Sequence, residues 1–256
     1  MATSPPSRNN PISGVGYFFK GLSLITQKGV KRYVILPLLI NILLFSVAIT
    51  VALTQLPVLM DSAVGLLPAW LGWLSWLLLP LFIVVVALVA FFGFAVLGNL
   101  IAAPFNGPLA EAVERKLTGE VSDSPRDSRG LIKDISSSIL SELRKLGYFA
   151  IRAIPLLILL LIPVINLVAS VLWLLFASWM LALEYADYPM ANHGLSFRRQ
   201  REVLRKRRFL SLGYGGVLTL VLIIPGLNFL LIPAGVAGAT AMWVDQLSAA
   251  AKPDGA

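Results

Sequence analysis

The chain has 256 residues, of which 57% are hydrophobic and only 13% are charged, and its mean hydropathy is +0.83. These values exclude an ordinary soluble domain and indicate an integral membrane protein. The formal charge of +8 does not favour nucleic acid as a partner, because the cations gather beside the apolar runs, as the positive-inside rule predicts. The absence of cysteine excludes disulfides and cysteine-ligated metal.

The N-terminal region predicts an amphipathic helix over residues 12–28. It has no compact apolar core followed by a small-residue cleavage site, so we expect no removable signal peptide. We expect this helix to lie at the membrane interface or to prolong a membrane helix. Its apolar side chains recur at helical spacing: Ile12, Val15, Phe18, Leu22 and Ile25.

Residues 31–56 and 70–117 predict two long helices, since no Lys or Arg stands between Arg32 and Arg115. About 20 residues at a rise of 1.5 Å suffice to cross a hydrocarbon core of roughly 30 Å. The expected turn between them contains Pro57, Asp61, Gly65 and Pro68. Three tryptophans follow as an interfacial cluster: Trp70, Trp73 and Trp76.

Residues 131–183 predict a helical hairpin that begins with an amphipathic cytoplasmic extension. The uncharged stretch 153–183 is too long for one comfortable crossing and too short for two. Its flanks are basic, which places both on the cytoplasmic side, so the hairpin turns back within the bilayer. Pro163 removes a backbone donor at the break, and Asn166 is positioned to cap the next half-helix.

The same Pro-x-x-Asn pattern recurs in residues 203–247, at Pro225 and Asn228. Paired interrupted segments are typical of transport pathways, although ordinary kinked helices in a bundle would give the same pattern. The predicted fold is an all-α integral membrane protein that forms one membrane domain over 1–256. It has two long transmembrane helices, two re-entrant hairpins that cross half the membrane, and amphipathic cytoplasmic helical extensions.

The stretch TQKGVKRYVILP contains the strongest candidate binding site, at Gly29, Val30, Lys31 and Arg32. We expect Gly29 to cap the first helix in a left-handed conformation. The next helix then starts with free N–H groups and two cations at its positive dipole end, where a bound anion would offset the repulsion. The alternative is that these cations only fix topology or hold lipid headgroups.

Other polar residues carry weaker signals. Glu111 and Arg115 are spaced for an ion pair on one helix face and are candidates for a pathway mouth. His193 is the only histidine and lies in a predicted turn, so we expect no metal site. No P-loop or hydrolase motif is present, which argues against an ATP-driven pump and against an enzyme. The small residues of AGVAGATA, 234–241, predict close helix contact.

Several stretches, in this order, resemble the bacterial CysZ sulfate permeases over most of the chain from Gly21 to Asp245. They are GLSLITQKGVKRYVILPLLIN, NLIAAPFNGPLAE, LLIPVINLVASVLWLLFASWMLALEYADYPMANH, SLGYGG and IPGLNFLLIPAGVAGATAMWVD. The resemblance implies an all-helical protein of the bacterial inner membrane, multi-pass and homo-oligomeric, from a dimer up to a hexamer. It also implies sulfate uptake for cysteine biosynthesis.

The resemblance assigns sulfate binding to Gly29, Val30, Lys31 and Arg32. The family commonly has arginine where this chain has Lys31, which keeps the charge and loses bidentate geometry. Asn106 and Asn228, at expected helix starts, join Glu111 and Arg115 as pathway candidates. Sulfite and related oxyanions are not distinguished from sulfate.

The leading hypothesis is ATP-independent sulfate uptake, by a channel or an ion-coupled transporter that needs no cofactor. A membrane scaffold is the alternative hypothesis. It would bind anionic lipid or partner subunits through the basic loops.

Overall fold

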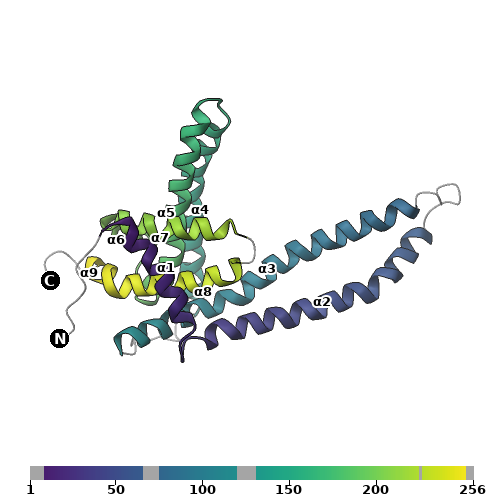
Figure 1. The fold of residues 1–256 in the computed structure, drawn as a ribbon, viewed down its shortest axis with the longest axis horizontal. Helices are drawn as coiled ribbons and strands as arrows, with labels where there is room; N and C mark the ends of the chain where they lie inside the picture. The colour runs from purple at the N-terminus through teal and green to yellow at the C-terminus, as the bar shows by residue number, and fades with distance from the viewer. Residues whose placement is uncertain (1–8, 66–74, 120–130, 225–226, 252–256) are drawn as a thin grey trace. The chain divides into compact units, whose positions relative to one another are not determined.

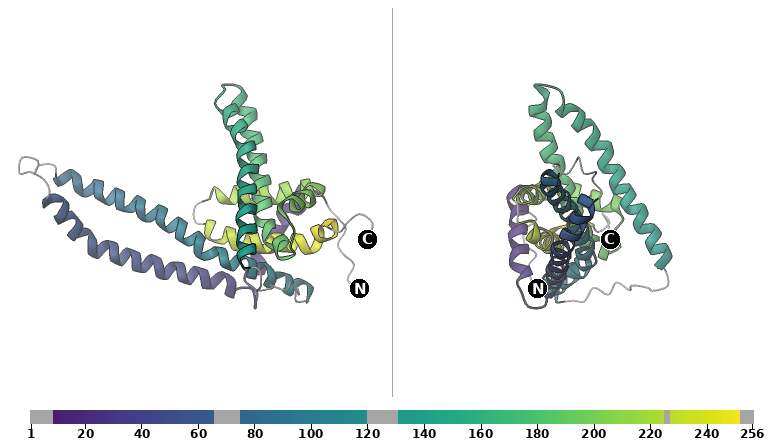
Figure 2. Two further views of the ribbon diagram at one scale, coloured as in Figure 1. Left: turned by 180° about the vertical axis from the view of Figure 1, so that it is seen from behind. Right: turned by 90° about the vertical axis from the view of Figure 1, so that its right-hand side faces the viewer.

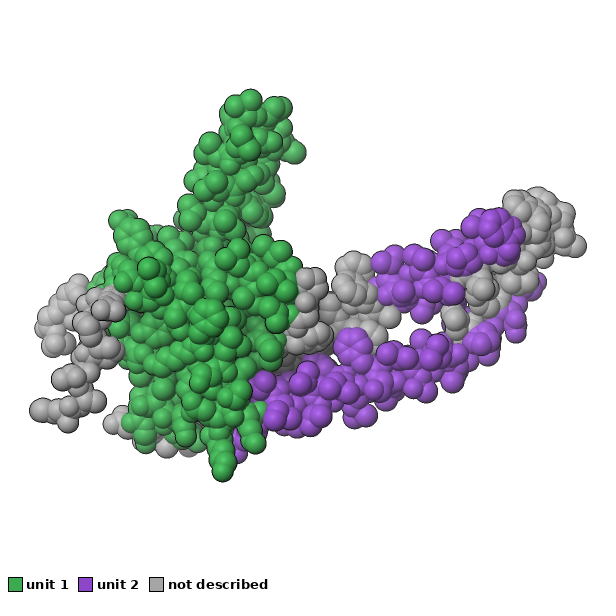
Figure 3. Space-filling view, viewed as in Figure 1, with its two compact units in different colours: residues 1–31, 106–256 green, residues 32–105 purple. Residues whose placement is uncertain are grey.

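The computed structural model describes residues 9–65, 75–119, 131–224 and 227–251, which form helices and turns without a strand. The all-helical prediction is therefore confirmed for these parts of the chain. The chain divides into two compact units (Figure 3). Unit 1 contains Met1–Lys31 with Asn106–Ala256, and unit 2 contains Arg32–Phe105.

Unit 2 consists of helix α2 (Arg32–Gly65) and the first part of α3 (Ser75–Thr118). The expected end of the first long helix at residue 56 is wrong, because α2 continues through Pro57 and Asp61 to Gly65. A proline costs one backbone hydrogen bond, and membrane helices tolerate this loss. Of the predicted tryptophan cluster, Trp70 and Trp73 lie outside the described residues, and Trp76 is exposed on α3.

Three helices among the described residues are long and apolar enough to cross a membrane. They are Arg32–Leu59, Ile165–Asn192 and Leu230–Ala251. The large apolar side chains along α2 are mostly exposed, which water would not tolerate over so long a surface. A membrane protein accounts for this pattern.

The core of unit 1 is built around α8 (Asn228–Met242), a helix of small residues. It packs against α1 (Pro11–Ile25) and against α5 (Ile165–Asn192), as Figure 1 shows. A side chain at Gly21 of α1 would collide with the backbone of α8 at Ala234 and Gly238. The prediction that the small residues of 234–241 allow close helix contact is therefore confirmed.

Helix α1 buries Phe18 and Ile25 of the predicted apolar face, but the rest of its buried face differs from the prediction. Ile12 is 83% exposed, whereas Gly14, Phe18 and Gly21 are buried against other helices. Its buried face packs on α8 and on α7 (Arg208–Leu222), and its place relative to a membrane stays a prediction. Glycines allow its backbone to approach closely, and apolar spacing alone does not reveal a glycine face.

The first hairpin joins α4 (Leu131–Leu160) to α5 and projects from unit 1 in all three ribbon views (Figures 1 and 2). The break predicted at Pro163 is confirmed, since residues 161–164 form a turn. The predicted cap is wrong: Val164 is the N-cap of α5, with φ at +70° and no side-chain capping bond. Asn166 instead lies in the first turn, where its backbone N–H donates to the Ile162 carbonyl.

The second hairpin joins α7 to α8, and its predicted Pro225 lies outside the described residues. The prediction that Asn228 starts a helix is confirmed, because it is the first residue of α8. The remaining short helices lie in unit 1. They are α6 (Phe197–Lys206), the π-helix η3 (Trp243–Leu247) and α9 (Ser248–Ala251).

Candidate functional site

The turn after α1 carries the residues predicted to bind an anion. Gly29 has φ at +91°, a left-handed conformation that glycine adopts without strain. It is not the helix cap, however, because α1 ends at Ile25 and Thr26 occupies the C-cap position. The turn is therefore longer than predicted, and Gly29 bends the chain just before α2.

Hydrogen bonds inside this turn limit what the backbone can offer a ligand. The Gln27 carbonyl accepts from the Val30 N–H at 3.2 Å and from the Lys31 N–H at 3.1 Å. Those two amides are occupied, so the expectation of free N–H groups applies only from Arg32, where α2 begins. Val30 is fully buried and anchors the turn.

The candidate site contains two cations, Lys31 and Arg32, and the boundary between the two units falls between them. Lys31, in unit 1, and Arg32, in unit 2, both have exposed side chains. The Arg32 guanidinium donates to the Tyr33 hydroxyl at 2.8 Å and lies 4.7 Å from the centre of the Tyr33 ring. This contact holds the guanidinium while leaving several of its five N–H donors available.

A polar cluster forms where the end of α3 meets the end of α5 in unit 1. Asn106 is buried and donates to the Tyr188 hydroxyl at 3.1 Å, and Asn192 donates to the Gly107 carbonyl at 3.1 Å. Asn106 lies inside α3, so the expected helix start at this position is wrong. Its amide nonetheless has a defined partner from another helix.

Glu114 and His193 form the pair that the sequence reasoning missed. His193 Nε2 lies 2.8 Å from Glu114 Oε1, and the imidazole ring faces Trp243 with the ring centres 5.2 Å apart. Glu114 is buried, and its Oε2 has no hydrogen-bond partner. The two residues are 79 positions apart, so no local motif could reveal them. The pair places an imidazole nitrogen beside a buried carboxylate that has one unpaired oxygen.

The other pathway candidates lie on α3 and at the start of α8. Glu111 and Arg115 are one turn apart near the end of α3, with Glu111 partly buried and Arg115 exposed. Asn228 begins α8, and its side chain is outside the described set. Among the described residues, no group of three His, Cys, Asp or Glu could hold a metal ion.

An ion pair ties the base of the first hairpin together. Lys145 on α4 lies 2.5 Å from Asp187 on α5 and 2.8 Å from Glu142. Burial alone would lower the pKa of Lys145, but the Asp187 and Glu142 carboxylates outweigh it and raise that pKa above its ordinary value. Gln200 of α6 also donates to Asp187, at 2.6 Å.

Comparison with known proteins assigns the family. The family model described as "Sulfate transporter CysZ/Etoposide-induced protein 2.4" matches residues 17–233. The chain belongs to this family. A "Sulfate transporter CysZ" of Pseudomonas fluorescens strain Pf-5 is 51% identical over 236 residues, which cover 92% of this chain and 94% of the relative. Proteins of the same name from strains Pf0-1 and SBW25 are 48% and 49% identical, with 93% or more of each chain covered.

The EI24/CysZ match includes the residues described above. It spans the turn at Gly29, the polar cluster at Asn106, the Glu114–His193 pair and the start of α8. The family resemblance stated from the sequence is therefore confirmed. Its relatives are named as transporters, not as enzymes, which agrees with the expectation from the sequence motifs.

Proposed function

We propose that this protein takes up sulfate across the bacterial inner membrane and supplies sulfur for cysteine biosynthesis. The observation that carries the proposal is about half identity, over more than nine-tenths of the chain, to relatives named sulfate transporters. The exposed apolar helices support a multi-pass protein. No P-loop stands in the sequence, so a sulfate gradient or a coupled ion drives the movement rather than ATP.

In the proposed membrane arrangement, α2 and α3 are the two long transmembrane helices, and both hairpins enter and leave on the same side. The 15 residues of α7 support this arrangement for the second hairpin. At 1.5 Å per residue α7 is about 22 Å long, less than the hydrocarbon thickness of about 30 Å. The family resemblance further implies a homo-oligomer.

Sulfate binds, in this proposal, at Gly29, Val30, Lys31 and Arg32. Two cations at the N-terminal end of α2 face the positive end of its dipole, an unfavourable placement that an anion offsets. The first-turn N–H groups from Arg32 onward and the Arg32 guanidinium supply donors. Lys31 contributes a compact point charge rather than a two-pronged contact.

The pathway is proposed to include Asn106, Glu111, Arg115 and Asn228. The burial of Asn106 and its bond to Tyr188 support a fixed polar position there. We add the Glu114–His193 pair to this pathway, because the orphan oxygen of Glu114 lies on the same α3 segment as Asn106, Glu111 and Arg115.

Uptake of radiolabelled sulfate into liposomes that contain the purified protein tests transport directly. Uptake should clearly exceed that of protein-free liposomes and persist without ATP. Equal uptake in the two preparations would refute the transport proposal.

The binding site is tested by equilibrium sulfate binding to the purified chain. Lys31→Gln and Arg32→Gln should each weaken binding about tenfold, the value of one hydrogen bond between charged groups. Lys28→Gln is the matched control, because Lys28 is an exposed cation of the same turn. If all three variants weaken binding equally, total loop charge matters rather than position, and the scaffold hypothesis is favoured instead.

A further inference from the structure

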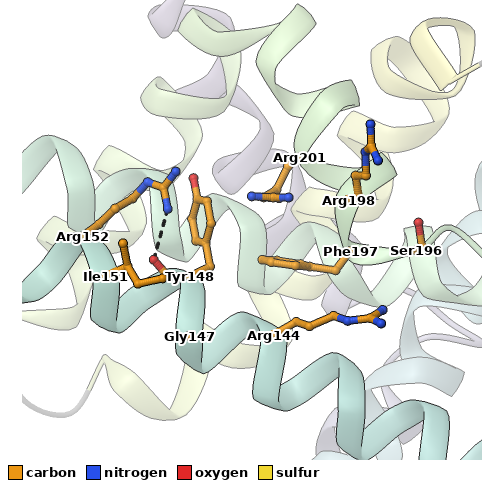
Figure 4. A pocket seen from close by; sticks show the side chains of 9 residues that line it. All are labelled: Arg144, Gly147, Tyr148, Ile151, Arg152, Ser196, Phe197, Arg198 and Arg201. Atoms are coloured by element: carbon orange, nitrogen blue, oxygen red, sulfur yellow. Dashed lines mark hydrogen bonds between the residues drawn. The ribbon is translucent and has the colours of Figure 1, made fainter.

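A pocket of about 650 Å³ lies in unit 1 between α4 and α6, well apart in sequence from the proposed sulfate-binding turn. Figure 4 shows its side chains, with arginines arranged around two aromatic rings. The lining residues that matter here are Arg144, Arg152, Arg198, Arg201, Tyr148 and Phe197. The cavity contains cations and apolar walls, and no carboxylate lines it.

The positive charge of the pocket is largely uncompensated. Within the part of the chain that the structure describes, only Arg198 among the four arginines has a carboxylate partner, Glu202 at 3.2 Å. The Arg201 Nε atom is buried without a hydrogen-bond partner. A buried donor left unpaired is costly, and an anion in the pocket would remove that cost.

Aromatic rings hold two of the guanidinium groups in place. The Arg152 and Arg201 guanidinium carbons lie 3.7 and 4.7 Å from the centre of the Tyr148 ring, and Arg201 also lies 5.0 Å from that of Phe197. Tyr148 is itself fixed, because its hydroxyl accepts from Trp179 at 3.0 Å. Such stacking orients the planar groups and leaves their edges free to bind an oxyanion.

An exposed apolar face of α4 continues from the pocket. Ile151 lines the cavity and is 72% exposed, and Ile154 and Ile158 follow at helical spacing, also exposed. These residues lead toward the turn of the first hairpin, at 161–164, whose apolar side chains are exposed. A cationic pocket at the base of a lipid-facing helix has the arrangement expected of a headgroup site.

We propose that this pocket binds the phosphate of an anionic phospholipid, with an acyl chain lying along Ile151, Ile154 and Ile158. The arginines pair with the phosphate through charge-assisted bonds. The exposed apolar face of α4 favours a lipid over a free anion, because inorganic sulfate or phosphate has no apolar part to bury against it. The site does not depend on the proposed transport of sulfate.

Native mass spectrometry of the full-length protein in detergent can test this site with phosphatidylglycerol, phosphatidylcholine and sn-glycerol 3-phosphate as probes. Phosphatidylglycerol should bind about tenfold more tightly than either of the others. Arg152→Gln combined with Arg201→Gln should abolish that preference, whereas Arg152→Lys with Arg201→Lys should retain part of it. Arg205→Gln with Arg208→Gln is the matched control, since both are exposed cations outside the pocket.

Two outcomes would overturn the proposal. Equal losses in the pocket and control variants would mean that general surface charge attracts the lipid. Binding of sn-glycerol 3-phosphate or inorganic sulfate as tight as that of phosphatidylglycerol would identify a free-oxyanion site. Unchanged sulfate uptake in the pocket variants leaves the lipid proposal intact, so the two proposals fail separately.

Discussion

The two hairpins share the Pro-x-x-Asn pattern but are covered to very different extents. In the apolar window of Ile165–Asn192, which contains α5, 22% of the residues are buried, whereas in Leu230–Ala251, which contains α8, 72% are buried. Both segments carry few charged residues: Glu184 and Asp187 in the first and Asp245 in the second. Apolarity therefore does not distinguish a lipid-facing helix from one in the centre of the protein.

Side-chain size explains the difference better than hydropathy. The buried part of α8 is built from Ala and Gly, which allow α1 to approach closely at Gly21 and Gly238. The exposed part of α5 carries Leu and Val, whose bulk keeps other helices away and suits acyl chains. Membrane helices associate through small residues because lipid is as apolar as leucine.

The largest expected effect comes from truncating a leucine in each hairpin. Leu218 of α7 is fully buried, and Leu167 of α5 is 75% exposed. Leu218→Ala should lower the free energy of unfolding by about 3 kcal/mol, because it leaves a cavity. Leu167→Ala should change it by less than about 0.5 kcal/mol. Thermal unfolding in detergent measures both, and equal losses would show that α5 is packed against protein.

A pair of adjacent glycines in α7 gives the next largest effect. A methyl group at Gly215 would collide with the Ser178 carbonyl of α5, whereas at Gly216 its nearest neighbour is the Ser178 hydroxyl at 3.8 Å. Gly215→Ala should destabilise the protein by about 2 kcal/mol through overpacking. Gly216→Ala should be neutral or stabilising by up to about 1 kcal/mol, since alanine favours helix. Similar losses in both variants would contradict the close α5–α7 contact.

The sequence predicted the breaks in the hairpins better than the surfaces that cover them. Pro163 breaks the first hairpin because proline removes a donor, and this effect is local. Pro57 has the same chemistry but lies inside α2, so a proline alone does not decide where a membrane helix ends. The buried face of α1 was predicted only in part, at Phe18 and Ile25, because Gly14 and Gly21 add nothing to an apolar count.

The candidate binding site also shows that local features can be predicted from the sequence, whereas contacts between distant residues cannot. The left-handed Gly29 was predicted from local sequence, and its φ of +91° agrees. The capture of two amides by the Gln27 carbonyl depends on the length of the turn, which the residues do not specify. The Glu114–His193 pair depends on α3 meeting the end of α5 across 79 positions. Such contacts require tertiary packing that one sequence does not reveal.

A smaller effect on stability is expected at the base of the first hairpin. There a partly buried ion pair, rather than apolar packing, joins α4 to α5. Lys145→Met should destabilise the protein by about 1.5 kcal/mol at pH 7, because Asp187 keeps only its bond from Gln200. The raised pKa of Lys145 means that its contribution is complete below its ordinary value of 10.5 and is lost as the pH rises further. The difference between wild type and variant should therefore be constant from pH 7 to 9 and narrow only in strong alkali. A difference that grew with pH would contradict this assignment.

Single cysteine substitutions should have the smallest effect on stability. They also give the sharpest test of how deep each hairpin enters the membrane, because the chain contains no cysteine of its own. Val164→Cys, at the 82% exposed turn of the first hairpin, and Ile223→Cys, at the turn of the second, should leave unfolding unchanged. Neither should react with a membrane-impermeant maleimide from either side of sealed vesicles, since a thiolate forms only where water is present. Arg205→Cys, on an exposed polar position of α6, is the positive control.

The lengths of the helices make the two cysteines informative in different ways. With 15 residues, α7 rises about 22 Å, so we expect the second turn to stop short of the far surface. From Lys145 to Leu160 helix α4 rises about 22 Å and the turn at 161–164 extends beyond it, so the tilt of the hairpin decides how deep the first turn lies. Labelling of Val164→Cys from outside, with Ile223→Cys unreactive, would make the first hairpin a complete crossing and leave only the second as re-entrant.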